Sequence, residues 1–420
     1  MLMKLILFSV LSAIVATEKV RYDNFSLYKL HPANEEQLEF LKDLHENGEG
    51  LDFWYPPTRV GDYVSVVSPP DMKEEFENSL KNRDIHPEVM LENIQEAFDA
   101  QLQSRRKRDT NATRELFWTA YQTQDEIIEW FHHLAQTYPD VVSVVIGGRS
   151  YEGRNITGVR ISRGTGLRAM FLEGGQVGAD WLSPTVLTYI VDQLVRGEDP
   201  EARAATEEFE WHIFPIINPD GFEFSQDSVR LWVKNRRPIG SGIQQTFGVD
   251  LTKNWNSQWG VSGGSFTPAS DNFIGLGPFS EIETRSLSRY IESIRFRLEG
   301  VLSFRQFGQR FLVPFAHTSE ALYNFNDVLT VGRRAMGSLA VRYGTQYIVG
   351  SSRNVHDGAT GTLADWVKHR FNPTLVATYQ LRDLGLWGYT LPVVQVQPSC
   401  EETFDSLMAL LREARFTNML

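Results

Sequence analysis

After residue 117 the chain alternates between short apolar runs and helical stripes, and this alternation constrains its fold most strongly. Residues 123–137 have the period of an amphipathic helix, with apolar side chains at Ile127, Ile128, Phe131 and Leu134. Alternating strands and helices predict an α/β fold, a mixed, largely parallel twisted sheet with helices on both faces. A ligand site in such a fold is expected beyond the carboxyl ends of the strands. The other expected elements are strands at residues 141–146, 157–161, 170–173 and 210–217 and a helix at residues 183–196.

The first part of the chain has a different organisation. Asn34 precedes Gln37 by three residues, which is close to a capping box and marks the start of a helix. The order of elements predicts a small α+β antiparallel open sandwich at residues 17–108, the smaller of two domains in a chain of 420 residues. Its expected strands are residues 20–30, 51–55 and 63–67, and its expected helices are residues 34–47, 72–82 and 89–103.

A run of four basic residues, Arg105-Arg-Lys-Arg108, lies between the two expected domains. In an acidic chain of net charge -12, such a run is an exposed, extended segment that a processing protease of basic specificity can bind. We predict cleavage after Arg108, which leaves residues 109–420 as the larger domain. A charged linker is the alternative interpretation.

The first 16 residues carry Lys4 and then an apolar run, as a secretory signal peptide does. This run is too short to span a bilayer, and no other segment has the pattern of a membrane helix, so we expect a secreted protein without a membrane partner. The negative net charge argues against nucleic-acid binding, which needs a basic face. The single cysteine, Cys400, excludes an intrachain disulfide. We expect a buried thiol there, with an intermolecular bridge as the alternative.

Several strings of the larger domain resemble those of the zinc carboxypeptidases of the A/B type, in the family's order. The strings are the turn at residues 173–184 (EGGQVGADWLSP), NPDG at 218–221, LWVKNRRP at 231–238, GVDLTKNW at 248–255, GPFSE at 277–281, YQLRD at 379–383 and GYTLP at 388–392. The resemblance implies a carboxypeptidase-like fold, a propeptide that covers the cleft until it is removed, and a catalytic zinc site.

The resemblance places the three zinc ligands at Val177, Asp180 and Arg305. Catalytic zinc needs three protein ligands with lone pairs and an open fourth position. Valine has no lone pair, and arginine is a permanent cation without an acceptor, so we expect no zinc cofactor. We expect instead a hydrogen-bonded pair between Arg305 and Asp180 across the vacant site. Four histidines fit no zinc spacing and are expected to be structural or solvated: His132, His133, His212 and His356.

The other chemical positions of the family are also replaced. The general base maps to Gln380, whose amide does not ionise near neutral pH, and the arginine that polarises the scissile carbonyl maps to Val233. The pair that grips the substrate's terminal carboxylate becomes a threonine and a lysine, which keep one positive charge but lose the bidentate fork of arginine. The residues expected to line the peptide cleft are Thr252, Lys253, Asp357 and Ala364.

These replacements predict a secreted, propeptide-bearing carboxypeptidase homologue that does not hydrolyse peptides. Its former cleft is expected to bind a peptide, a protein partner or its own propeptide. Two alternatives stay open: an active metallocarboxypeptidase that releases C-terminal residues, and an inert secreted structural protein. Sequons that can carry N-linked glycans in a secreted chain are at Asn24, Asn111 and Asn155.

Overall fold

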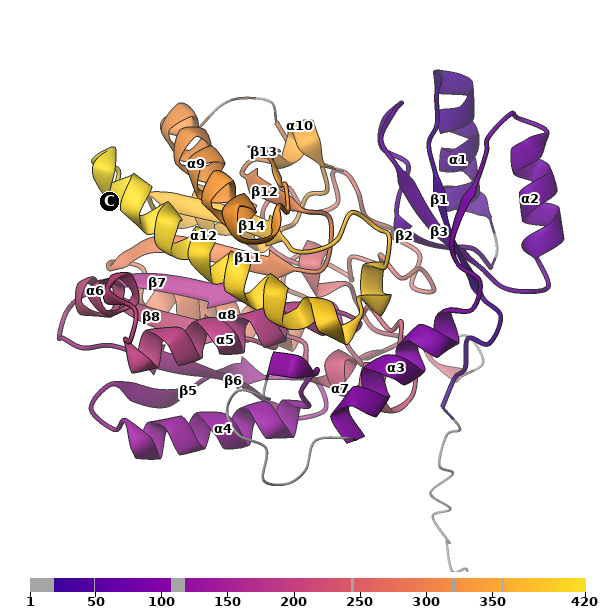
Figure 1. Cartoon of the computed structure of the whole chain (residues 1–420). Helices are drawn as coiled ribbons and strands as arrows, with labels where there is room; N and C mark the ends of the chain where they lie inside the picture. The colour runs from indigo at the N-terminus through magenta and orange to yellow at the C-terminus, as the bar shows by residue number, and fades with distance from the viewer. Residues whose placement is uncertain are drawn as a thin grey trace, which may run out of the picture.

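The computed structural model describes residues 19–48, 50–106, 118–242, 245–318, 320, 322–356 and 358–420. A small N-terminal domain (residues 19–106) packs against one end of a large C-terminal domain (residues 118–420), as Figure 1 shows. Among the described residues, no helix is both long enough and apolar enough to cross a membrane. The predicted signal peptide (residues 1–16), the predicted cleavage point at Arg108, and residues Asn111 and Asp357 lie outside the described residues. The prediction that the basic run is extended is wrong for its first two residues, because Arg105 and Arg106 form the end of the helix Ile94–Arg106.

The N-terminal domain is a four-stranded antiparallel sheet in the order β2-β3-β1-β4. Alternate residues of its strands face opposite sides. One side packs on α1 and α2 (Figure 1), and the other packs on α3 and on the C-terminal domain. The elements are β1 (Ser26–Leu30), α1 (Glu35–Asn47), β2 (Asp52–Tyr55), β3 (Val64–Ser68), α2 (Lys73–Lys81), β4 (Glu88–Leu91) and α3 (Ile94–Arg106).

The prediction of one helix over residues 89–103 is wrong, because β4 occupies its beginning. Val89 is the Cα partner of Tyr28 in β1, so the apolar run at this point completes the sheet edge. The helix starts later, where the side chain of Asn93 accepts a hydrogen bond from the amide of Gln95 at 3.2 Å. A short apolar run fits a strand and a helix equally well, and only pairing with a distant strand decides between them.

The C-terminal domain is built on an eight-stranded sheet in the order β13-β12-β14-β11-β7-β8-β6-β5. Its central strands β14, β11, β7 and β8 are parallel, whereas β5 and β6 are antiparallel and β12 runs antiparallel to β14. This is the mixed, largely parallel sheet that the alternation predicts. The strands are β5 (Val142–Arg149), β6 (Asn155–Ile161), β7 (Arg168–Glu173), β8 (Phe209–Phe214), β11 (Leu298–Arg305), β12 (Arg310–Val313), β13 (Ile348–Ser351) and β14 (Leu375–Gln380).

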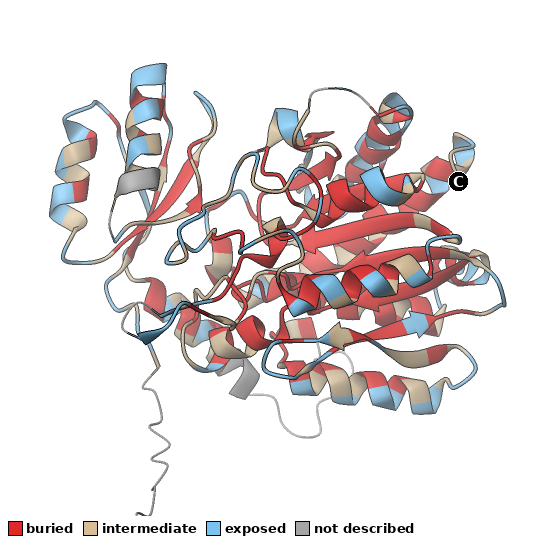
Figure 2. Cartoon of the chain, turned by 180° about the vertical axis from the view of Figure 1, so that it is seen from behind, coloured by how far each residue is buried: buried red, intermediate tan, exposed pale blue. Residues whose placement is uncertain are grey.

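Helices cover both faces of this sheet, and the central strands are buried between them (Figure 2). α4, α5, α6, α9 and α12 contribute to the core on one face, and α8 and α11 to the core on the other. Cys400 lies in α12 and is fully buried with a free thiol, as expected. The helices are α4 (Gln124–Thr137), α5 (Leu182–Arg196), α6 (Pro200–Glu208), α7 (Pro219–Asp227), α8 (Ile282–Ser293), α9 (Phe325–Tyr343), α10 (Ser352–Val355), α11 (Leu363–Phe371) and α12 (Val396–Phe416).

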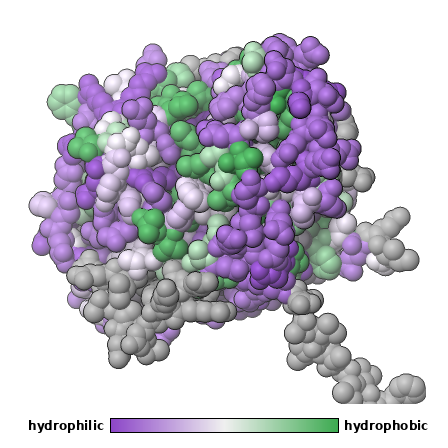
Figure 3. All heavy atoms as spheres, turned by 45° about the vertical axis from the view of Figure 1, so that its right-hand side comes forward, coloured by the Kyte–Doolittle hydropathy of each residue, from purple (hydrophilic) through white to green (hydrophobic). Residues whose placement is uncertain are grey.

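Short elements complete the domain: strands β9 (Pro238–Ile239) and β10 (Thr246–Phe247), and the 3-10 helices η3 (Leu251–Lys253), η4 (Gly388–Thr390) and η5 (Val393–Gln395). The surface on the side of the N-terminal domain is mostly hydrophilic, with hydrophobic residues in separate small groups (Figure 3). This agrees with burial of the second apolar side of the N-terminal sheet against the C-terminal domain.

Asn218 fixes the turn that follows β7. Its fully buried side chain donates to the carbonyl oxygens of Gln176 and Lys234, both at 3.1 Å, and accepts from the amide of Gly221 at 3.0 Å. One amide group therefore joins three segments: the turn, the start of α7 and the loop that follows α7.

Replacing Asn218 by alanine should lower the free energy of unfolding by roughly 3 kcal/mol or more, because several buried backbone groups lose their partner at once. Urea denaturation followed by tryptophan fluorescence measures this change. Asn256→Ala, at an exposed asparagine, is the matched control and should change little. Equal losses in the two variants would contradict the role assigned to Asn218.

Candidate functional site

The carboxyl ends of three central strands bring Glu173, Arg305 and Gln380 to one edge of the sheet. Arg305 and Gln380 are Cα partners at the ends of β11 and β14, and Ser303 of β11 is the Cα partner of Glu173 at the end of β7. This edge is where a ligand site is expected in an open α/β sheet. Arg305 and Gln380 were expected here. Glu173 was missed, although an acidic residue directly after a buried strand is a usable signal.

Val177 and Val233 lie on two segments that pack tightly together next to this edge. The amide of Gly178 donates to the carbonyl oxygen of Val233 at 3.0 Å. A Cβ on Gly178 would lie 2.5 Å from the carbonyl oxygen of Gly221 and 2.6 Å from that of Trp232, so the close approach requires glycine. The backbone thus brings two predicted site positions together, and both side chains are half-buried and apolar.

The expected hydrogen-bonded pair between Arg305 and Asp180, both within the described residues, is not formed. The carboxylate of Asp180 instead accepts from the amide of Ser183 at 2.9 Å, from the hydroxyl of Ser183 at 2.7 Å and from the amide of Gln306 at 3.0 Å. The Ser183 amide at the start of α5 and the Gln306 amide directly after β11 bind the carboxylate in place of Arg305. Burial raises the pKa of Asp180 to about 6, against the opposing effects of the Ser183 and Gln306 hydrogen bonds and the charge of Arg305.

Glu173 is fully buried at the end of β7. Its Oε1 accepts from the side-chain Nε2 of Gln176 at 2.7 Å and from the hydroxyl of Ser303, whereas its Oε2 has no hydrogen-bond partner within the described part of the chain. Burial raises the pKa of Glu173 to about 7, and the charge of Arg305 is the largest influence in the opposite direction. Two buried acids, Glu173 and Asp180, therefore interact electrostatically with one guanidinium.

Gln380 is buried and lies beside His356. The Nε2 of Gln380 is 3.0 Å from the Nε2 of His356, so the amide donates when this imidazole nitrogen is unprotonated. His356 was not expected at the site. Its neighbourhood in the sequence gives no signal for this contact, because the loop that carries His356 reaches Gln380 only through the fold.

Thr252 and Lys253 bond to Asp250, the residue directly before their short 3-10 helix. The Nζ of Lys253 lies 2.6 Å from Oδ2 of Asp250, and the hydroxyl of Thr252 donates to Oδ1 of Asp250 at 2.6 Å. Burial raises the pKa of Asp250, but Lys253 and Thr252 outweigh burial and leave this pKa lowered. The charged carboxylate therefore neutralises the positive group expected to attract a peptide terminus. Ala364 is buried in the first turn of α11.

Aromatic side chains of the N-terminal domain cover this edge of the sheet. The rings of Tyr55 and Tyr63 stack with their centroids 4.5 Å apart. The guanidinium of Arg310 lies 4.8 Å from the ring centroid of Tyr55, and the imidazole of His356 lies 6.3 Å from the same ring. Arg310 begins β12, and its Cα partner in β14 is Gln380. The two tyrosines thus contact the residues that surround Gln380.

Comparison with known proteins shows the family. The model described as zinc carboxypeptidase matches residues 127–406, and the model described as carboxypeptidase activation peptide matches residues 28–101. The chain belongs to the zinc carboxypeptidase family. Zinc carboxypeptidase A 1 of Anopheles gambiae is 36% identical over 409 residues, which are 96% of this chain and 92% of that protein. Zinc carboxypeptidase A 1 of Drosophila melanogaster is 33% identical over 425 residues, which cover 98% of each chain.

Two solved structures have the same fold. Carboxypeptidase A of Helicoverpa armigera has a TM-score of 0.83 at 25% identity and covers 94% of this chain and 98% of that chain. Thrombin activatable fibrinolysis inhibitor has a TM-score of 0.84 at 21% identity and covers 93% and 98%. These matches confirm the resemblance and the predicted fold class, including the N-terminal activation domain.

The residues at the predicted zinc positions do not form a ligand set for zinc. Of Val177, Asp180 and Arg305, only Asp180 offers lone pairs, and both of its oxygens already accept hydrogen bonds. Arg305 adds a fixed positive charge beside it. Within the described ranges, no three side chains of His, Cys, Asp or Glu are grouped so that they could hold a metal.

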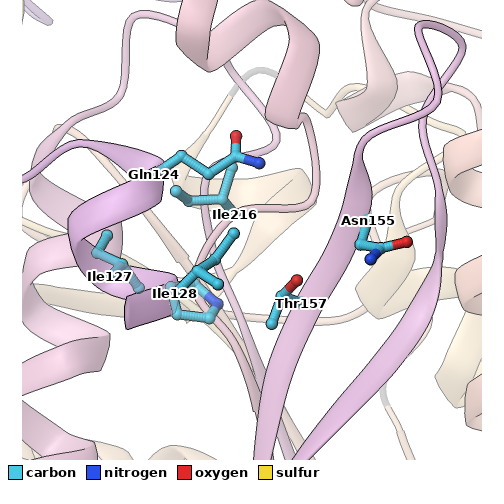
Figure 4. Close-up of a pocket in the computed structure, with 7 residues that line it drawn as sticks. Gln124, Ile127, Ile128, Asn155, Thr157 and Ile216 are labelled. Atoms are coloured by element: carbon cyan, nitrogen blue, oxygen red, sulfur yellow. The ribbon is translucent and has the colours of Figure 1, made fainter. Parts of the chain in front are cut away.

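A hollow lies between α4 and β6, and the segment that follows β8 completes its lining (Figure 4). Asn155 lies at its edge, at the start of β6, and is exposed as a glycosylated asparagine must be. Asn24 in the N-terminal domain is also exposed. Glycosylation of both residues stays a prediction. The hollow is lined by Gln124, Ile127, Ile128, Asn155, Thr157, Pro215 and Ile216.

Replacing Glu173 by glutamine should change the pH dependence of stability. A buried acid whose pKa rises from 4.5 to about 7 on folding stabilises the folded state at acid pH, and this contribution is lost as the pH rises through that interval. At about 1.4 kcal/mol per pKa unit, the loss is at most ~3.5 kcal/mol. We therefore expect the free energy of unfolding of the wild type to fall, relative to that of Glu173→Gln, between about pH 4.5 and about pH 7.5.

Urea denaturation of the two proteins at both pH values measures this difference. Glutamine keeps an oxygen that can accept the hydrogen bonds of Gln176 and Ser303, so the variant should fold. If both proteins lose or keep stability in parallel across the interval, Glu173 is not the buried acid described above.

Proposed function

We propose that this chain is a secreted, non-catalytic member of the zinc carboxypeptidase family whose former active site binds a protein segment without hydrolysing it. The observation that carries the proposal is the metal position, where Val177, Asp180 and Arg305 offer one carboxylate and one fixed cation in place of a ligand set. Secretion is part of the proposal and rests on the signal-like sequence of residues 1–16.

The two other chemical requirements of metal-assisted hydrolysis support the same proposal. Deprotonating the attacking water needs a base, and the amide of Gln380 cannot take up a proton near neutral pH. Stabilising the oxyanion needs a positive group or a donor aimed at the developing charge, and Val233 offers neither from its side chain. Each of these positions is fixed by a different part of the framework, so a shift of one segment does not restore them all.

What remains in the site favours binding through packing and charge. Arg305 and Arg310 provide cations, and the half-buried Val177 provides apolar surface. Lys253 is already paired with Asp250, so a free peptide carboxylate gains little there. A segment that offers aromatic rings to a guanidinium fits this site better than a bare peptide terminus does.

The alternative is an active metallocarboxypeptidase, as the names of the relatives imply for those proteins. The two proposals differ in zinc content and in product release. After treatment with a protease of basic specificity, we expect no stoichiometric zinc by mass spectrometry and no release of C-terminal residues from unblocked peptides. Bound zinc together with chelator-sensitive release would contradict the proposal and favour the enzyme.

Restoring the ligands should restore metal binding. We expect the variant Val177→His/Asp180→Glu/Arg305→His to bind about one zinc per chain, because two imidazoles and one carboxylate complete a catalytic-type ligand set. Equilibrium dialysis against zinc measures this. A control that carries the same replacements at exposed positions, Val341→His/Asp140→Glu/Arg333→His, should bind no more zinc than the wild type. Failure of the first variant to exceed the control would contradict the assignment of the three positions.

A further inference from the structure

We infer that the N-terminal domain stays bound after the chain is cut at the basic run, and that it is the permanent occupant of the former cleft. The inference rests on the proposed function in one respect: the N-terminal domain has to leave the cleft only if a substrate must enter it. Three groups of contacts at the domain junction carry it.

The first group is a buried aromatic cluster that runs through the junction. Trp54 and Phe98 of the N-terminal domain share this cluster with Phe307 of the C-terminal domain. The rings of Trp54 and Phe307 each meet Tyr389 edge-on, with centroids 5.6 Å apart. A Cβ on Gly388 would lie 2.4 Å from Cε3 of Trp54, so the indole packs directly on the backbone of the C-terminal domain. Buried aromatic anchors of this kind dominate the affinity of protein interfaces.

The second group is centred on Arg230, a guanidinium of the C-terminal domain that is only 2% exposed. It donates to the carbonyl oxygens of Ala179 and Tyr389, both at 2.8 Å, and to Oε1 of Gln101 in α3 at 3.3 Å. Gln101 in turn donates to the carbonyl oxygens of Tyr389 and Leu391 at 3.1 and 3.0 Å. Removal of α3 would expose this network, which is complete only while the N-terminal domain is in place.

The third group lies over the site itself. Arg310 is 3% exposed, and the ring of Tyr55 covers its guanidinium. Burial raises the pKa of Tyr63, with Arg310 opposing, so Tyr63 remains a neutral phenol in this contact. A peptide that entered the cleft would have to displace the stacked pair of tyrosines from Arg310. The N-terminal domain thus already supplies the aromatic segment that the site accepts.

Two further hydrogen bonds join the domains at the beginning of the described chain, which is distant in sequence from the basic run. The amide of Val20 donates to the carbonyl oxygen of Ser228 at 2.9 Å, and the Nζ of Lys19 donates to that of Gln226 at 2.7 Å. The N-terminal domain is therefore held at residues 19–20, at the β2–β3 region and at α3. None of these contacts depends on the covalent connection between the domains.

The test is limited digestion of the full chain with a protease of basic specificity, followed by size-exclusion chromatography at low micromolar concentration. A denaturing gel and N-terminal sequencing establish that the chain has been cut at the basic run. We expect the two fragments to elute together at the volume of the intact chain. Elution of the N-terminal fragment as a separate species would overturn the inference. Zinc content and peptide hydrolysis do not enter this measurement, so its failure is distinct from failure of the proposed function.

Two variants locate the contacts responsible. Arg310→Leu changes only the C-terminal domain, and Trp54→Ala removes the anchor from the N-terminal domain. Each should raise the concentration at which the cut complex is half dissociated by at least about tenfold. Phe53→Ala is the matched control. Phe53 lies next to Trp54 in β2, but its side chain packs on the opposite side of the sheet, with α1 and α2. Equal dissociation of Trp54→Ala and Phe53→Ala, together with an unchanged Arg310→Leu complex, would overturn the inference.

Discussion

Parallel pairing of β7, β11 and β14 is the constraint on which the rest of this structure depends. Main-chain hydrogen bonds set the register of these strands, and the register brings positions 173, 305 and 380 to the same edge whatever side chains they carry. This register is a property of the backbone, so it does not depend on the side chains that provide the chemistry of a site. The Asn218 side chain and the close approach at Gly178 hold the neighbouring turn in the same way, through backbone groups.

The two buried carboxylates at this edge of the sheet follow ordinary rules for buried charge. Asp180 is satisfied by the amides at the start of α5 and beyond β11, and it does not need a cation in contact. Glu173 is less well satisfied, and burial holds its pKa near neutrality. A guanidinium stabilises both acids from a distance, because its charge acts through a low-dielectric interior. A zinc ion would need the same carboxylate oxygens and would be repelled by Arg305.

The sequence predicts the fold and the framework well because both depend on patterns that span many residues. The helix predicted at residues 123–137 is one example: α4 spans Gln124–Thr137, and Thr123 and Glu126 at its start bond to each other's backbone amides. The failures concern contacts between distant segments. β4 forms because it pairs with β1. His356 contacts Gln380 from a loop, and Asp180 accepts hydrogen bonds from the Ser183 amide and not from Arg305. The spacing of residues along the chain does not predict these contacts, because they depend on which groups the fold brings close together.

The aromatic rings of the N-terminal domain cover the edge of the sheet that carries Gln380, and its helix α3 donates hydrogen bonds to buried carbonyl groups of the C-terminal domain. The central claim is nevertheless about the metal position. X-ray diffraction from crystals grown with zinc, measured on both sides of the zinc absorption edge, tests it most directly. The account predicts no anomalous peak coordinated by protein atoms next to Asp180. A strong peak at bonding distance from Asp180 and its neighbours would contradict it.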